Sequence, residues 1–122
     1  MKIKTLRSKY GNEYTAIDNI VFASKKEAKR YQELILLQRG RKIWNLAVHP
    51  RFELQGKFVD NMGNKQRAIT YEADFAYYEM DKNNNVKEKV IEDVKGYLTD
   101  TYKLKKRLFL YKYKDVIFRE IM

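Results

Sequence analysis

The sequence predicts one α/β domain in which helices flank a mixed central sheet, and three observations support this fold class. A length of 122 residues is typical of a single domain. Hydrophobic residues make up 44% of the chain, which is enough to build a core. Two stretches with helical periodicity alternate with segments in which apolar and polar residues alternate as in strands. We assign residues 1–13 to a basic, loosely ordered arm and residues 14–122 to the domain.

The first predicted elements are a hairpin and a helix. Residues 14–17 and 20–22 are two short strand-like segments separated by a two-residue Asp-Asn turn. Ser24 and Glu27 have the S-x-x-E spacing of a capping box, which predicts a helix that begins there and ends at Gly40. One side of this helix carries five residues at helical spacing: Ala28, Tyr31, Leu34, Ile35 and Gln38.

The middle of the chain predicts three further strands. After residues 43–48, which follow the helix, apolar and polar residues alternate over residues 51–55, 66–79 and 86–97. Turn residues separate the three alternating segments. Because the connections are short, we expect these three strands to form an antiparallel meander.

A second helix and a last strand complete the predicted domain. Thr99 or Asp100 can cap a helix that extends to about residue 113, and its apolar stripe consists of Leu104, Leu108 and Tyr111. Residues 116–121 predict the final strand. The helix before it allows a crossover to a parallel position. The order is therefore helix, three strands, helix, strand.

The composition excludes several classes of site. The chain has no cysteine, so it has no disulfide, no thiolate nucleophile and no cysteine-ligated metal. It has one histidine, which excludes a histidine cluster. No apolar run approaches the roughly 18–20 residues of a membrane span, so we expect no membrane partner. Any bound metal would take oxygen ligands, which suits Mg²⁺ or Mn²⁺.

Charge is distributed unevenly along the chain. The net charge is +10, yet residues 43–99 hold nine acidic and eight basic residues. The segments on either side are strongly basic. A cationic frame around an acidic centre favours a surface that binds a polyanion such as DNA, with a metal site inside it.

Two carboxylates and one ammonium are expected near one point. Asp93 and Lys95 share one face of the strand over residues 86–97, because side chains alternate along a strand. Asp74 lies on the preceding strand, and a symmetric turn would place it opposite residue 94. Glu27 adjoins the apolar side of the first helix. Its carboxylate either caps that helix or contributes to the site, and the pattern leaves both interpretations open.

Both predicted helices also carry basic runs. These residues either form a solvated face or contact phosphates: Lys25, Lys26, Lys29 and Arg30 on the first helix, and Lys103, Lys106 and Arg107 on the second. We expect His49 to be structural or exposed, because no serine or cysteine pattern accompanies it.

This combination resembles the PD-(D/E)XK nuclease superfamily, also called restriction-endonuclease-like. The signature is Asp74 followed by Asp93-x-Lys95, with Glu27 as the acid of the first helix, and the element order matches the αβββαβ core. The phrases FASKKEAKRY, YEADF and EDVKGYLTDTYKLKKRLFLY are similar to those of a phage-associated family of small single-domain members. One departure is Ala73, which stands where these proteins usually have proline.

The resemblance implies a divalent-metal-dependent endonuclease that hydrolyses DNA phosphodiester bonds, with a preference for branched DNA as in Holliday-junction resolvases. Asp74, Asp93 and the backbone carbonyl of Val94 would hold Mg²⁺ or Mn²⁺, and Glu27 would join them directly or through water. Lys95 would orient or deprotonate the attacking water. By analogy we also expect a homodimer in the cytoplasm of a bacterial host. Two alternatives stay open: a non-catalytic nucleic-acid-binding protein on a nuclease fold, and a phage assembly module.

Overall fold

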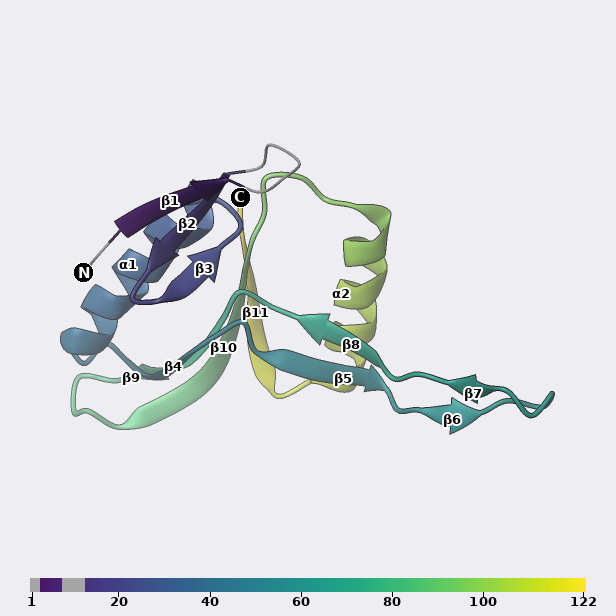
Figure 1. Cartoon of the computed structure of the whole chain (residues 1–122). Helices are drawn as coiled ribbons and strands as arrows, with labels where there is room; N and C mark the ends of the chain where they lie inside the picture. The colour runs from purple at the N-terminus through teal and green to yellow at the C-terminus, as the bar shows by residue number, and fades with distance from the viewer. Residues whose placement is uncertain (1–2, 8–12) are drawn as a thin grey trace.

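The computed structural model describes the backbone of residues 3–7 and 13–122, and side chains from residue 14 onward. Its centre is a four-stranded mixed sheet with α1 (Lys25–Arg39) and α2 (Asp100–Lys112) on either side (Figure 1). The strand order is β11 (Val116–Ile121), β10 (Val86–Val94), β9 (Phe75–Met80) and β4 (Ile43–Val48). β10 is parallel to β11, and β9 is antiparallel to both of its neighbours. The predicted fold class, a mixed α/β domain, is confirmed.

Local sequence signals account for the ends of the helices and the first turn. The Ser24 side chain accepts a hydrogen bond of 3.1 Å from the amide of Glu27, and α1 ends at Gly40 as expected. Thr99 caps α2 in the same way. β2 (Glu13–Ile17) and β3 (Ile20–Phe22) pair across a turn whose two residues both have positive φ angles, as an Asp-Asn hairpin turn requires.

Part of the expected basic arm belongs to a strand. Residues Ile3–Arg7 form β1, which pairs antiparallel with β2 along its whole length. The rest of the expected arm before β2, residues 1–2 and 8–12, lies outside the described residues.

The expected long strand over residues 66–79 is divided at Asp74. Its first part forms β8 (Ile69–Glu72), which pairs with β5 (Arg51–Gln55) in a separate ribbon. Its second part forms β9 of the central sheet, where β4 takes the place that we had assigned to residues 51–55. The chain changes partners at this point, and alternation alone does not show such a change. Two further short strands, β6 (Phe58–Val59) and β7 (Lys65–Gln66), extend the ribbon.

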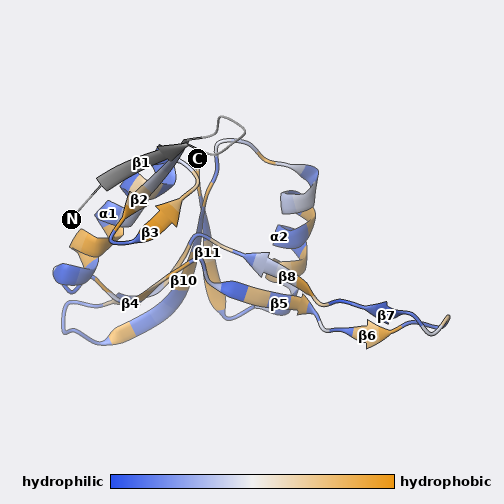
Figure 2. Ribbon diagram, in the orientation of Figure 1, coloured by the Kyte–Doolittle hydropathy of each residue, from blue (hydrophilic) through white to orange (hydrophobic). Residues whose placement is uncertain are grey.

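Two hydrophobic clusters cover the faces of the central sheet. Successive residues of β10 point to opposite faces, so Val90 packs with Leu34 of α1 and Ile91 packs with Phe109 of α2. β3, which contributes Phe22 to the cluster on the α1 side, is apolar in Figure 2. Both helices therefore rest on the sheet and fix the ends of its strands.

The predicted apolar stripe of α2 is wrong. Leu104, Leu108 and Tyr111 are 57%, 40% and 76% exposed, whereas Tyr102 and Phe109 are buried. The face that meets the sheet also carries Lys106, whose ammonium lies 5.4 Å from the Phe118 ring centroid and bonds to a carboxylate of β11. A lysine within the inward stripe conceals that stripe from a hydropathy pattern, because its aliphatic stem packs while its charge reaches a partner.

Candidate metal centre

The candidate site lies where the chain passes from the central sheet into the β5–β8 ribbon. His49 follows β4, and Asp74 lies between β8 and β9. The backbone amide of His49 donates to the carbonyl of Asp74 at 2.9 Å, and the amide of Ala73 donates to the carbonyl of Pro50 at 3.0 Å. These two hydrogen bonds hold the β4–β5 junction beside the β8–β9 junction. His49 has a left-handed backbone, with a φ of 54°, that turns the chain into the ribbon.

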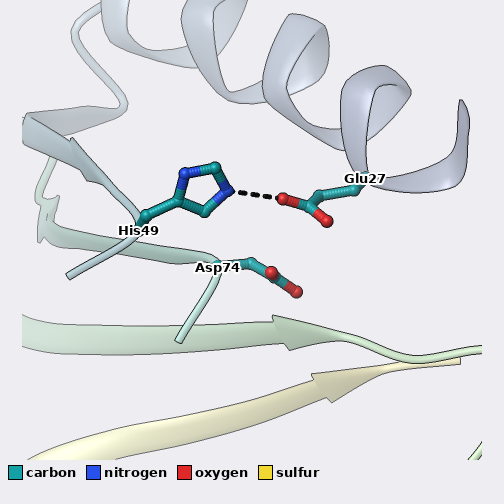
Figure 3. A group of neighbouring side chains, drawn as sticks. All are labelled: Glu27, His49 and Asp74. Carbon is teal, nitrogen blue, oxygen red and sulfur yellow. Dashed lines mark hydrogen bonds and ion pairs between the residues drawn. The ribbon is translucent and has the colours of Figure 1, made fainter. Parts of the chain in front are cut away.

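Three side chains from separate elements converge above this crossing (Figure 3). Glu27 comes from the first turn of α1, His49 from the end of β4, and Asp74 from the start of β9. Glu27 Oε1 lies 2.8 Å from His49 Nε2. One ligand-capable atom of each residue lies within 4.8 Å of the others. Two carboxylates and an imidazole at this spacing are a donor set able to surround a cation.

Asp74 carries the clearest electrostatic sign of a missing positive charge. Its Oδ2 accepts a hydrogen bond of 2.6 Å from the amide of Val94. The pKa of Asp74 is raised to about 8, chiefly by burial and then by the negative charges of Glu27 and Asp93, while the Val94 hydrogen bond opposes the shift. A divalent cation would remove this repulsion. The residues present therefore fit a metal ion.

Asp93 and Lys95 form the second part of the site. Asp93 is fully buried, and its Oδ2 accepts a hydrogen bond from the hydroxyl of Tyr71. Lys95 Nζ lies 2.8 Å from Asp93 Oδ1, but the contact falls outside hydrogen-bond geometry. Among the described residues, Oδ1 thus has an ionic neighbour and no hydrogen-bond donor. A buried carboxylate oxygen in this state retains its capacity to bind a cation.

The ammonium of Lys95 is held in position by an aromatic ring. It lies 4.2 Å from the ring centroid of Tyr102 in α2, a cation–π contact. The Tyr102 hydroxyl donates to Glu120 of β11 at 2.6 Å. The position of the Tyr102 ring is therefore set by α2 and β11 together. The ring in turn holds the ammonium of Lys95 at the edge of the site.

We expected residue 74 to lie opposite roughly residue 94, and the ladder between β9 and β10 runs one position from that register. A bulge near the start of β10 places two of its residues opposite one residue of β9. The ladder then continues to Phe75 opposite Glu92, so the next step aligns Asp74 with Asp93. The bulge was invisible in the sequence, because a one-residue shift leaves the alternation of each strand unchanged.

The structure brings together the four side chains that the sequence singled out for catalysis. Asp74 lies within the electrostatic reach of Glu27 and Asp93, and Lys95 contacts Asp93. The Glu27 carboxylate contacts His49, while the cap of α1 is formed by the Ser24 side chain, which accepts a hydrogen bond from the Glu27 amide. The catalytic roles, and the binding of metal by the Val94 carbonyl, stay predictions.

The seven predicted phosphate contacts separate into two groups. Arg30 forms an ion pair with Glu92, which engages its guanidinium within the fold. Lys106 forms one with Glu120, and Lys26 donates to a backbone carbonyl. Helical spacing identifies which residues form a charged face, but it does not show which carboxylates of other elements will pair with them. The side chains of the other four are exposed: Lys25, Lys29, Lys103 and Arg107.

Sequence reasoning missed two residues of this site. His49, expected to be structural or exposed, contacts Glu27 inside the cluster. The signal was its place at a junction of two strand segments, beside the only proline of the chain. Tyr71 was assigned to the core by alternation, yet its hydroxyl bonds to Asp93. A buried tyrosine hydroxyl requires a polar partner, and that requirement was the available signal.

Comparisons with known proteins give a family for nearly the whole chain. A family model described as "Protein of unknown function (DUF1064)" matches residues 7–122. No curated protein and no solved structure matches the chain. Among the helices of the described residues, none is long and apolar enough to cross a membrane.

Proposed function

We propose that this chain, which belongs to the DUF1064 family, is a divalent-metal-dependent endonuclease that hydrolyses phosphodiester bonds of DNA. The observation that carries the proposal is the convergence of Asp74 and Asp93 beside Lys95, with a buried Asp93 oxygen to which none of the described residues donates a hydrogen bond. The element order α1, β4, β9, β10, α2, β11 agrees with the αβββαβ order of a restriction-endonuclease-like core. This agreement supports the same proposal.

Each side chain of the cluster has a role in this proposal. Asp74, Asp93 and Glu27 would hold the cation, because carboxylate oxygens are the ligands that Mg²⁺ and Mn²⁺ prefer. The bound ion would lower the pKa of a water nucleophile and offset charge that develops on the phosphate. Lys95 presents a fixed positive charge to the same phosphate or orients the attacking water.

Two neighbours position the proposed ligands. His49 contacts the Glu27 carboxylate at 2.8 Å, and the Tyr71 hydroxyl donates to Asp93. Hydrogen bonds of this kind fix the rotamer of a metal-binding side chain before the ion arrives. The site is thus supported by residues from α1, the β4–β5 junction and β8.

The charge of the chain supports nucleic acid as the substrate. The net charge is +10, and the exposed Lys29, Lys103 and Arg107 are available near the N-terminal half of each helix. Phosphate contacts of this type position DNA without reading its sequence. Selection by DNA structure, such as a four-way junction, therefore agrees better with this small domain than recognition of a long sequence.

A cleavage assay tests the proposal directly. The substrates are a four-way junction, a flap, a linear duplex and single strands, each with Mg²⁺, Mn²⁺ or EDTA. The proteins are the wild type, Asp93→Asn, and the control Glu72→Gln, which removes an exposed carboxylate on β8 two residues from Asp74. We expect metal-dependent cutting by the wild type and the control, and none by Asp93→Asn.

The pattern of cutting also separates the alternatives. Preference for the junction would identify a resolvase-like enzyme, and equal cutting of all duplex forms would identify a general nuclease. DNA binding without cutting under any metal would contradict the proposal in favour of a non-catalytic DNA-binding protein. Cutting by Asp93→Asn at the wild-type rate would remove Asp93 from the site.

A further inference from the structure

A two-stranded arm extends away from the sheet and both helices (Figure 1). We define the arm as residues 56–68, which include β6 and β7. It continues the β5–β8 ribbon, which packs on α2 through the ring of Phe52 against Phe109. In Figure 1 the arm itself lies against neither helix. An isolated two-stranded hairpin is at best marginally stable in water, so this arm needs a reason to be ordered.

Part of that reason lies in its turn. Asp60 Oδ1 accepts hydrogen bonds of 2.9 Å from the amides of Met62 and Asn64. Its Oδ2 accepts a third from the side-chain amide of Gln66, also at 2.9 Å. These bonds lower the pKa of Asp60, with the Gln66 bond as the largest cause. The one acidic residue of the arm therefore holds its turn together, and the three cations of the arm outnumber it.

The outward surface of the arm combines apolar and cationic side chains. Phe58, Val59 and Met62 are 45%, 63% and 81% exposed, an unusual state for three large apolar residues in one short segment. Figure 2 shows β6 as apolar beside a hydrophilic β7. A hollow of about 330 Å³ is lined by Phe58 and Val59 together with Lys57, Lys65 and Gln66. Such a surface is typical of one that another molecule covers.

The charge of the arm indicates which kind of molecule would bind to it. The arm carries three exposed cations, Lys57, Lys65 and Arg67, against an acid that its turn has engaged. A second copy of this chain, with its own charge of +10, would place like charges together. Duplex DNA instead offers phosphates to the cations and a groove wide enough for a two-stranded ribbon. Apolar side chains of such ribbons contact base and sugar edges.

We propose that the arm is a DNA-binding ribbon that contacts the duplex about one helical turn from the bond that the metal centre cuts. This position rests on the proposed function. The ribbon begins at His49 and Asp74, so one end of it is part of the metal centre. From there to Met62 is about twelve residues of extended chain, or at most about 40 Å. That length corresponds to about ten to twelve base pairs of B-DNA.

The test compares binding to duplexes of different length. Fluorescence anisotropy in EDTA measures the affinity of the full chain for duplexes of about 8 and about 24 base pairs, lengths set by the one-turn spacing. The arm variant is Lys57→Gln with Lys65→Gln. Its matched control is Lys82→Gln with Lys87→Gln in the β9–β10 turn, where Asp81 Oδ1 accepts from the amides of Asn83 and Asn85 in the same manner.

We expect the arm variant to bind the long duplex about tenfold more weakly, with its salt slope reduced by about 2. On the short duplex it should match the wild type, and the control should match the wild type on both. Equal weakening by arm variant and control, or weakening that is independent of length, would overturn the proposal. An unchanged affinity of the arm variant for the long duplex would overturn it as well.

Failure of this proposal is distinguishable from failure of the nuclease. If the protein cuts DNA and the arm variant cuts and binds all lengths like the wild type, the arm proposal fails and the nuclease stands. If the arm variant loses affinity only for long duplexes in a protein that never cuts, the DNA contact of the arm is supported. The nuclease proposal then fails, together with the position relative to a cut bond.

Discussion

Glu92 and Asp93 are successive, fully buried carboxylates of β10, and their surroundings differ completely. Glu92 faces α1, where its two oxygens accept hydrogen bonds of 2.8 and 2.7 Å from the guanidinium of Arg30 and another from the Tyr77 hydroxyl. Asp93 faces α2, where Lys95 lies 2.8 Å from an oxygen that has no hydrogen-bond donor among the described residues. Burial alone therefore does not distinguish the two carboxylates. They differ in their partners, because Arg30 donates to both oxygens of Glu92, whereas Asp93 has one ionic neighbour and one hydroxyl donor.

The two faces of β10 also differ in the positive charge that lies beside each carboxylate. The hydrogen bond with Glu92 is the largest cause of the raised pKa of Arg30. Burying an ion pair is costly, and the bidentate geometry offsets that cost within the protein. The cluster of Asp93, Asp74 and Glu27 contains more negative charge than Lys95 can balance. In the proposed function, a bound divalent cation would balance the remaining negative charge.

The largest effect should follow from breaking the ion pair between Arg30 and Glu92. Arg30→Gln leaves Glu92 buried without its partner, so we expect the free energy of unfolding to fall by about 3–5 kcal/mol. Urea denaturation at low temperature measures this change. The control is Arg51→Gln, whose partner Glu72 is exposed, with an expected loss of about 0.5 kcal/mol or less. A loss of that small size for Arg30→Gln would show that the pair does not stabilise the fold.

The stability of the cluster of Asp74, Asp93 and Glu27 should instead respond to added metal. At a Mn²⁺ concentration 100 times its dissociation constant, we expect the free energy of unfolding of the wild type to rise by about 2.7 kcal/mol. Asp93→Asn should lose this increase, because it removes a proposed ligand, while Glu72→Gln should retain it. Denaturation with and without Mn²⁺ provides the measurement. If Asp93→Asn is stabilised as much as the wild type, Asp93 is not a ligand.

A smaller effect should appear as a pH dependence in EDTA. The folded pKa of Asp74 is about 8, above its unfolded value of 3.8, so the folded state binds an extra proton between these values. Stability from this residue is full below pH 4 and is lost as the pH rises toward 8. Asp74→Asn should therefore gain stability relative to the wild type as the pH rises from 4 to 9, with no such difference at pH 4. Parallel stability profiles for the two proteins would contradict the raised pKa.

The smallest effect compares two tyrosine hydroxyls, one on each carboxylate. Tyr71→Phe removes the donor to Asp93, and we expect the affinity for Mn²⁺ to fall about tenfold. Tyr77→Phe removes the donor to Glu92, which keeps both bonds from Arg30, so metal affinity should not change. Calorimetric titration with Mn²⁺ measures both variants. Equal losses would mean that the two faces of β10 are not independent.

Much of the fold could be predicted because its signals are local. The Ser24 and Thr99 caps, the two-residue turn after β2 and the parallel position of β11 all follow from short patterns. Asp74, Asp93 and Lys95 were also visible as charges within apolar strands. In each case the residues that decide the outcome are close together in the sequence.

The rest depends on contacts between distant segments. The bulge in β10 changes the partner of Asp74 without changing either pattern, and the inward position of Lys106 depends on Glu120. His49 belongs to the cluster only because β4 ends beside the start of α1. Neither periodicity nor composition contains this information, since it arises when the elements meet.

The hydrogen bond from the Val94 amide to Asp74 has a spectroscopic consequence. A side-chain oxygen here occupies a place in the ladder that a backbone carbonyl would fill in a regular strand pair, so the Asp74 rotamer is set when the sheet forms. The Val94 amide proton points directly at the carboxylate whose charge would change on protonation or metal binding. Its NMR resonance would therefore act as a built-in indicator of that charge, readable without a substrate or a label on the side chain.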